Sequence, residues 1–201
     1  MVSAGGLIAF RTDTFYGLGA DPFSRPAIDR IKRLKGRKGL KGLRGGDEGK
    51  PILIVVSDLD QVDRFLAERT RVFDLLAGAF WPGPLTLIGK ARREVPNELT
   101  AGTGTIGVRL PDDEDLRVLV RACGGALTAT SANPAARAPA CTAREVETYF
   151  PDGIDLIVDG GRARSDRPST VLDLTGTEPG LVREGAISRA ELEAALETCM
   201  G

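Results

Sequence analysis

The sequence of 201 residues contains no histidine. Histidine is the side chain whose ordinary pKa lies closest to neutral pH, and it is therefore the usual general base there. Ser-His-Asp and Cys-His catalytic sites, and zinc sites with histidine ligands, all depend on it. These classes of site are excluded. Any catalysis by this chain has to rest on cationic side chains, carboxylates, hydroxyl groups and backbone amides.

Cysteine is scarce as well, with Cys123, Cys141 and Cys199 far apart and in no CxxC spacing. Such an arrangement argues against a disulfide framework and against a zinc ribbon. We therefore expect a reducing compartment, which predicts a cytoplasmic location, and we expect no metal site built from these residues.

Long apolar runs are also missing. The first residues, MVSAGGLIAFRT, lack the charged start and the long apolar stretch of a signal peptide. The strongest aliphatic run, ILIVV at residues 52–56, is far too short to cross a bilayer. The sequence therefore predicts a soluble intracellular protein with no membrane partner.

Charge is balanced in total but not along the chain. The 27 Lys and Arg residues stand against 28 Asp and Glu, so the net charge of −1 does not indicate a nucleic-acid binder. Residues 30–50, by contrast, contain nine basic and two acidic residues, a net charge of +7. The glycine-rich part of this segment, KGRKGLKGLRGGDEGK, suits a phosphate loop, a basic tail for nucleic acid or a surface insertion.

Short aliphatic runs recur, several of them apolar throughout, as strands buried on both faces tend to be. They are residues 7–10, 52–56, 85–89, 105–110, 126–130, 156–161, 170–175 and 181–184. Helical patterns lie between them, and their expected N-caps are Ser24, Asp58, Asp112 or Asp113, Thr142 and Ser188. This alternation predicts one layered α/β domain over residues 1–201 with a mixed sheet.

Two familiar nucleotide motifs occur by chance. GTGTIG at residues 102–107 matches G-x-G-x-x-G, but VRLP follows it, and the dinucleotide motif has to open a helix. GGDEGKP resembles the end of a P-loop, but Arg44 and Pro51 stand where glycine and Ser or Thr are required, and a strand follows. ATP binding by this chain would therefore not use a P-loop.

Polar residues lie beside or within several of the predicted strands, or at the end of a predicted helix, and these are positions where a rigid scaffold presents chemistry. They are Thr12, Asp13, Thr14, Lys35, Arg37, Lys50, Thr105, Arg109, Ser131, Asn133, Ser169, Thr170 and Arg183. Arg109 is the most informative, because a cation inside an apolar strand needs a buried anionic partner. A substrate carboxylate would suit its bidentate geometry. An aspartate of the protein would serve equally, and for one residue taken alone that is the commoner case.

The other residues have ordinary structural uses too. Lys35 and Arg37 suit a helix C-terminus, where each cation is worth about 0.3–1 kcal/mol. Ser131 and Asn133 suit a turn, and Thr12 and Asp13 could cap a helix. Singly, each of these residues is best explained by such a use.

In order along the chain, however, these segments resemble one family. They are TDTFYGLGAD (12–21), KGR (35–37), KPILIVV (50–56), WPGPLTLI (81–88), TIGVRLPD (105–112), TSAN (130–133), VDGG (158–161), PSTVLDL (168–174) and VREG (182–185). The set is similar to the YrdC-like L-threonylcarbamoyladenylate (threonylcarbamoyl-AMP) synthases, and the resemblance spans nearly the whole chain.

The resemblance implies a single-domain α/β fold whose twisted, mixed parallel and antiparallel sheet, flanked by helices, curls around a positively charged concave cavity. It also implies an enzyme that makes threonylcarbamoyl-AMP and pyrophosphate from L-threonine, bicarbonate and ATP. The product would pass to a tRNA threonylcarbamoyl transferase, which modifies the adenosine next to the anticodon. Contact between the chain itself and tRNA is a further expectation.

Matched position by position, the family's threonine site falls on Thr12, Arg109, Ser169 and the backbone near Ala129. The ATP site falls on Lys35, Arg37, Lys50, Thr105, Ser131, Asn133 and Arg183, of which Lys35, Arg37 and Lys50 would be the catalytic cations. Mg²⁺ is expected with the nucleotide. An adenylation needs in-line positioning and neutralisation of phosphate charge, and neither requires an imidazole.

The chain departs from the family's pattern at several positions. Arg11 stands where relatives have proline, Val55 where they often have histidine, and Ala140 where they often have serine. Residues 38–49 are an insertion, which we expect to be a loop at the mouth of the cavity. The chain ends after one predicted helix, so the C-terminal accessory domain of longer relatives is expected to be absent.

A second function class fits the basic segment. A tRNA or double-stranded RNA binding module on the same scaffold would use the +7 segment to contact phosphates and would have no synthase activity. The two hypotheses differ over Arg109, which the enzyme needs for a carboxylate and the RNA binder does not.

Overall fold

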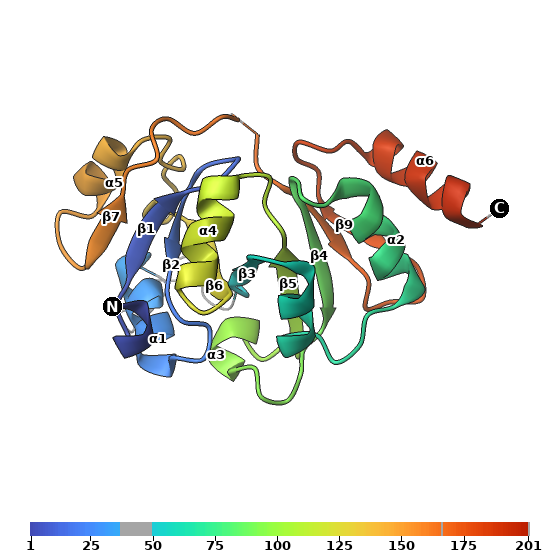
Figure 1. The fold of residues 1–201 in the computed structure, drawn as a ribbon, viewed down its shortest axis with the longest axis horizontal. Helices are drawn as coiled ribbons and strands as arrows, with labels where there is room; N and C mark the ends of the chain where they lie inside the picture. Colours follow the sequence, from blue (N-terminus) through green and yellow to red (C-terminus); the bar gives the residue numbers. More distant parts are fainter. Residues whose placement is uncertain (37–49, 166, 201) are drawn as a thin grey trace.

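The computed structural model of the chain describes residues 1–36, 50–165 and 167–200. Within them, nine strands form one sheet in the order β7-β1-β2-β6-β3-β5-β4-β8-β9, seen edge to edge in Figure 1. The strands are β1 (Ile8–Arg11), β2 (Tyr16–Gly19), β3 (Leu53–Val56), β4 (Leu85–Lys90), β5 (Thr105–Arg109), β6 (Ala126–Ser131), β7 (Leu156–Val158), β8 (Thr170–Asp173) and β9 (Gly180–Arg183).

The sheet is mixed, as predicted. Three neighbouring pairs are parallel, namely β1 with β7, β3 with β5 and β4 with β8. The other pairs are antiparallel. Because one sheet joins all of these strands, the described residues form a single α/β domain.

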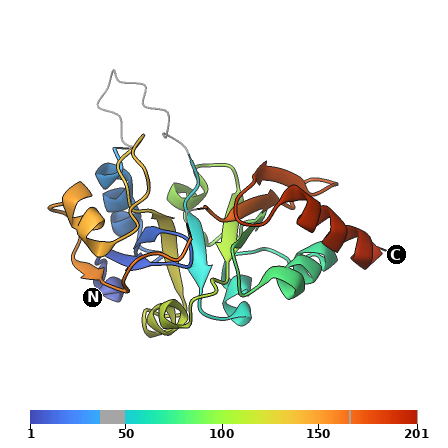
Figure 2. The same ribbon diagram turned by 90° about the horizontal axis from the view of Figure 1, so that it is seen from above.

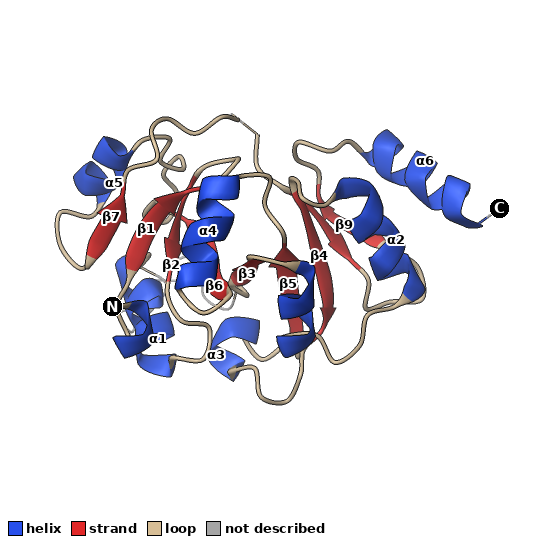
Figure 3. Cartoon of the chain, in the orientation of Figure 1, coloured by secondary structure: helices blue, strands red, loops and turns tan. Residues whose placement is uncertain are grey.

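Helices lie on both sides of the sheet (Figure 3). They are α1 (Arg25–Leu34), α2 (Arg71–Phe80), α3 (Asn97–Thr100), α4 (Glu114–Ala122), α5 (Ala143–Tyr149) and α6 (Arg189–Met200), with 3₁₀ helices η1 (Val2–Ala4) and η2 (Leu59–Arg64). Seen from above, α4 lies across the strands from α1 and α5 (Figure 2). None of the helices in the described ranges is long and apolar enough to cross a membrane.

The hydrophobic core has parts on both faces of the sheet, because successive side chains of a strand point to opposite faces. In β3, Val55 packs with Leu116 and Val120 of α4. Its neighbour Ile54 belongs to the larger cluster that includes Ile28 of α1. Both faces of the central strands are therefore covered, which explains why these runs are apolar throughout.

All eight predicted strands are present, with ends that shift by a few residues. The GTGTIG segment leads into β5 and not into a helix, as predicted. Strand β2 and helices α2 and α3 were not predicted. The helix expected after Asp58 is the 3₁₀ helix η2 and not an α-helix.

The other helix starts are confirmed. Asp113 and Thr142 cap α4 and α5 by accepting hydrogen bonds from Leu116 N and Glu145 N, both at 3.2 Å. The Ser188 hydroxyl accepts from Glu191 N at 3.3 Å and contacts the Glu191 carboxylate, as in a capping box. Ser24 precedes α1 but makes no capping hydrogen bond with its side chain.

Ala136 has a φ of 66°, in the left-handed region that disfavours a side chain with a Cβ atom. Strain in this region costs an alanine about 1–2 kcal/mol, and glycine avoids that cost. Glycine also loses more chain entropy on folding, which offsets part of the stabilisation. We expect Ala136→Gly to raise the free energy of unfolding, measured in urea, by about 0.5–1 kcal/mol.

The matched control for this prediction is Ala79→Gly, which makes the same chemical change on the exposed face of α2. It should lower stability by about 0.5–1 kcal/mol, because glycine is a poor helix former. A loss of stability in both variants would show that the strain at Ala136 is relieved by its surroundings.

Candidate functional site

The turn between β1 and β2 holds Thr12 rigidly. The Thr12 side chain is buried, and its hydroxyl accepts hydrogen bonds from the backbone N of Thr14 at 3.1 Å and of Phe15 at 3.2 Å. The same hydroxyl donates to Phe15 O at 2.7 Å. The turn is thus closed by its own first side chain, which fixes the direction of the residues that follow Thr12.

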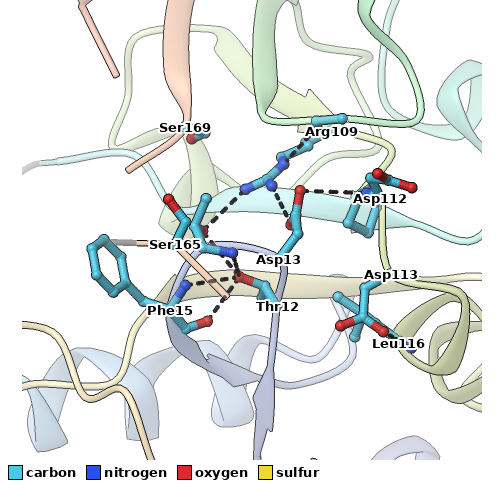
Figure 4. A network of polar contacts seen from close by, with 12 residues as sticks. Thr12, Asp13, Phe15, Arg109, Asp112, Asp113, Leu116, Ser165 and Ser169 are labelled. Carbon is cyan, nitrogen blue, oxygen red and sulfur yellow. Dashed lines mark hydrogen bonds and ion pairs between the residues drawn. The ribbon is translucent and has the colours of Figure 1, made fainter. Parts of the chain in front are cut away.

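Arg109 is the last residue of β5 and is buried, with 6% of its surface exposed. Its Nε donates to Gly83 O at 3.0 Å, its Nη1 lies 3.4 Å from the Thr14 hydroxyl, and its Nη2 forms an ion pair with Asp13 (Figure 4). Burial lowers the pKa of Arg109, and the Asp13 carboxylate opposes this shift. The prediction of a buried anionic partner is confirmed, and in this structure that partner is an aspartate of the protein.

Ser169 and Arg183 lie against each other near Arg109. Arg183 donates from Nε and Nη2 to Ser169 O at 3.2 and 2.8 Å, and from Nη2 to the Ser169 hydroxyl at 3.2 Å. That hydroxyl also lies 3.1 Å from the hydroxyl of Thr86. Desolvation lowers the pKa of Arg183, and the positive charge of Arg109 lowers it further. The two guanidinium groups therefore act on each other, and we call Asp13, Arg109, Ser169 and Arg183 the arginine cluster.

A second group forms around Lys35, which follows α1 and is 3% exposed. Its Nζ donates to Ser131 O at 2.6 Å and to Asn133 O at 3.1 Å, and lies 3.4 Å from a side-chain oxygen of each. The Asn133 side chain is itself fixed, since its Nδ2 donates to Arg137 O at 2.6 Å. We call Lys35, Ser131 and Asn133 the lysine cluster; it brings together three residues predicted for the ATP site.

The remaining predicted residues are more scattered. Ala129 lies in β6 beside Leu53. Thr105 is at the opposite end of β5 from Arg109, about 13 Å away at the usual rise per residue, and its hydroxyl lies 2.9 Å from that of Thr103. Lys50 is exposed just before β3. The predicted catalytic residue Arg37 and the predicted loop at residues 38–49 lie outside the described residues.

A third arginine, Arg11, lies near the arginine cluster, and its partner was not predicted from the sequence. Arg11 donates from Nε and Nη2 to Asp113 Oδ2 at 3.1 and 2.9 Å, and from Nη1 to Gly160 O. Asp113 also caps α4, so one carboxylate joins the end of β1 to the start of that helix. The only sequence signal was the predicted cap at residues 112–113, which does not reveal a partner 102 residues away.

Tyr16 fixes the segment after β7 in a similar way. Its hydroxyl donates to Gly161 O at 2.7 Å and accepts from Gly160 N at 3.1 Å. Burial raises the pKa of Tyr16, while the hydrogen bond from Gly160 opposes this shift. The VDGG motif is therefore held against β2 by a buried phenol.

Two further observations concern cavities and metal ligands. A cavity of about 150 Å³ lies elsewhere, lined by residues that include Leu66, Phe73 and Leu174, and none of the predicted site residues lines it. Among the described residues, no group of three or more cysteine, aspartate or glutamate side chains is arranged to hold a metal ion.

Comparison with known sequences gives consistent matches over most of the chain. The family model Sua5/YciO/YrdC, described as telomere recombination, matches residues 1–185. A threonylcarbamoyl-AMP synthase of Pyrococcus abyssi is 34% identical over 192 residues, covering 96% of this chain and 54% of the relative. One of Marinobacter nauticus is 36% identical over 174 residues, covering 86% and 87%. The chain thus spans about half of the archaeal relative and most of the bacterial one.

Solved structures agree with these matches. The crystal structure of P. abyssi Sua5 complexed with L-threonine superposes with a TM-score of 0.89 at 34% identity, covering 97% of this chain and 55% of that one. The crystal structure of Escherichia coli YciO gives a TM-score of 0.80 at 28% identity, covering 95% and 88%. The predicted fold class is confirmed by these likenesses; the positively charged concave cavity stays a prediction.

Proposed function

This chain belongs to the Sua5/YciO/YrdC family, and on that basis we propose that it is a threonylcarbamoyl-AMP synthase, which converts L-threonine, bicarbonate and ATP into threonylcarbamoyl-AMP and pyrophosphate. The observation that carries this proposal is the arginine cluster. It presents two guanidinium groups and one carboxylate at strand ends, an excess of positive charge that suits an anionic substrate. The relatives of similar length have the same activity in their names.

The two clusters would bind different substrates. Arg109 and Ser169, with Thr12 beside them, would hold threonine, and the Arg109 guanidinium would receive its carboxylate (Figure 4). Lys35, Ser131 and Asn133 would face ATP, together with Arg37, Lys50 and Thr105. Arg183 was predicted for the ATP site, and its hydrogen bonds to Ser169 would place it beside the proposed threonine site.

The chemistry is a substitution at the α-phosphorus of ATP. Threonine and bicarbonate first give N-carboxy-threonine with loss of water, and one carboxylate oxygen of its N-carboxy group then attacks the α-phosphorus in line. The bond from that phosphorus to the bridging oxygen breaks, and pyrophosphate leaves with its electron pair. The protein has to align the reactants and neutralise phosphate charge, which the ammonium of Lys35 and the arginines can do without a histidine.

Mg²⁺ is part of this proposal as a companion of the nucleotide. Asp13, the carboxylate of the arginine cluster, is already paired with Arg109. The described residues therefore suit a metal ion that is held through phosphate oxygens, where it would neutralise charge on the leaving group. The cytoplasmic location and the transfer of product to a tRNA threonylcarbamoyl transferase stay predictions as well.

The test is an assay of pyrophosphate release with ATP, bicarbonate and purified protein. We expect release that depends on added L-threonine, with the mixed anhydride detected by mass spectrometry. Release at the same rate without threonine would refute the synthase.

The RNA-binding alternative rests on the +7 segment, most of which lies outside the described residues. It predicts affinity for tRNA that falls steeply as salt rises, with no threonine-dependent turnover. The same preparation of protein, tested by gel shift at two salt concentrations, separates the two functions.

A further inference from the structure

Asp13 occupies an unusual place among the charged residues. In its ion pair with Arg109 the two side chains are only 10% and 7% exposed. Every other ion pair between described residues has at least one side chain that is more than 10% exposed. A buried pair is worth little as net stability, because desolvation of both ions cancels most of the attraction. Its value has to be sought in what it orients.

The Arg109 guanidinium is hydrogen-bonded by three residues from two separate segments. Gly83, which precedes β4, accepts from Nε, and the β1–β2 turn supplies Thr14 at Nη1 and Asp13 at Nη2. The second oxygen of Asp13 lies 3.4 Å from Asp112 N, at the start of the α4 segment (Figure 4). Asp13 thereby links the guanidinium both to the β1–β2 turn and to the segment that leads into α4.

The count of donors leaves room for a ligand. A guanidinium has five N–H groups in a fixed plane. Within the described part of the structure three of them are engaged, by Gly83, Thr14 and Asp13. Two remain, one on each terminal nitrogen, and they can donate to the oxygens of a substrate carboxylate.

We propose that Asp13 is a positioning residue for substrate: it fixes the plane of the Arg109 guanidinium so that the two remaining N–H groups receive the carboxylate of L-threonine. This inference rests on the proposed function. It assigns to Asp13 a share of the affinity for threonine and none of the affinity for ATP, because Lys35 and its partners form a separate cluster.

The contrary role would be competition. A carboxylate beside Arg109 repels a second carboxylate, and if that repulsion dominated, removal of Asp13 would tighten threonine binding. The geometry favours positioning, because Arg183 lies close enough to add a second positive charge that attracts the substrate whether or not Asp13 is charged. Losing the alignment of Arg109 would then outweigh the gain from removing one negative charge.

The first experiment compares Asp13→Asn with the wild-type protein. We expect the KM for threonine, and the Kd for threonine measured by calorimetry without ATP, to rise about tenfold. The KM for ATP should stay within about twofold, since the nucleotide residues are not coupled to Asp13. Asp13→Glu restores the charge and should recover part of the threonine affinity.

The matched control is Asp58→Asn, which removes the carboxylate of an Asp–Arg pair that is exposed, at 47% and 51%. Neither KM should change. A purely structural role for Asp13 predicts a lower melting temperature with unchanged threonine affinity, and that result would overturn the proposal, as would tighter threonine binding or an equal rise in both KM values.

A double variant shows whether Asp13 acts through Arg109. Arg109→Lys removes the planar donors, so adding Asp13→Asn to it should weaken threonine binding no further; additive losses would refute the positioning role. The synthase itself is judged separately, by threonine-dependent pyrophosphate release from the wild-type protein. If the wild-type protein showed no threonine-dependent release, KM values could not be compared. The Kd for threonine from calorimetry would still show whether Asp13 contributes to threonine binding.

Discussion

Replacing Lys35 with alanine is expected to lower threonine-dependent pyrophosphate release by at least about 100-fold, as loss of one preorganised charge at a transition state does elsewhere. The structure explains why the ammonium counts as preorganised. Its Nζ is buried and held by the carbonyl oxygens of Ser131 and Asn133 at the end of β6. A phosphate oxygen arriving there would meet a charge that needs no reorientation.

Lys32→Ala is the matched control, because it removes a lysine from the last turn of α1, three residues before Lys35. Its activity should stay within about twofold of wild type, as expected for a partly exposed surface cation. Circular dichroism and a thermal scan of both variants show whether α1 is intact. Near-normal turnover by a folded Lys35→Ala variant would remove Lys35 from the proposed ATP site.

The strands could be predicted because they are short apolar runs between recognisable turns. β2 could not, because its sequence YGLG is half glycine, and glycine is a poor strand former. The reason for the glycines is tertiary: a Cβ atom on Gly19 would clash with the ring of Phe10 and lie 3.0 Å from Thr128 O. The residues next to Gly19 in the sequence do not show that two neighbouring strands approach it this closely.

The two helices that were not predicted differ in how much sequence signal they carry. Phe73, Leu76, Ala77 and Phe80 do recur at helical spacing after the cap Thr70, so α2 was open to prediction. α3 has a single turn of four residues, too short for any periodic signal.

For the site, residue types could be predicted but contacts could not. An arginine in an apolar strand predicted an anionic partner, yet that partner, Asp13, lies 96 residues away in the chain. The same separation divides Lys35 from Ser131. Strand order brings both pairs together, and that order depends on how the whole sheet assembles, which residue spacing does not encode.

Arg109→Ala is the second change with a large expected effect, and it acts on both stability and activity. The substitution leaves the Asp13 carboxylate largely buried without its cation, which should lower the free energy of unfolding by about 3–5 kcal/mol. Threonine-dependent turnover should fall below detection, because the proposed carboxylate receptor is gone. Urea unfolding and the pyrophosphate assay measure the two effects. The control Arg121→Ala breaks the exposed pair with Asp58 and should leave the free energy of unfolding nearly unchanged.

A loss of activity with a loss of stability invites the objection that the variant simply unfolds. Adding Asp13→Asn to Arg109→Ala answers it, because the double variant no longer buries an unpaired charge and should regain part of the lost stability. Its activity should remain absent, since the guanidinium is still missing. If turnover returned together with stability, Arg109 would be a structural partner of Asp13 and not the receptor of a substrate carboxylate.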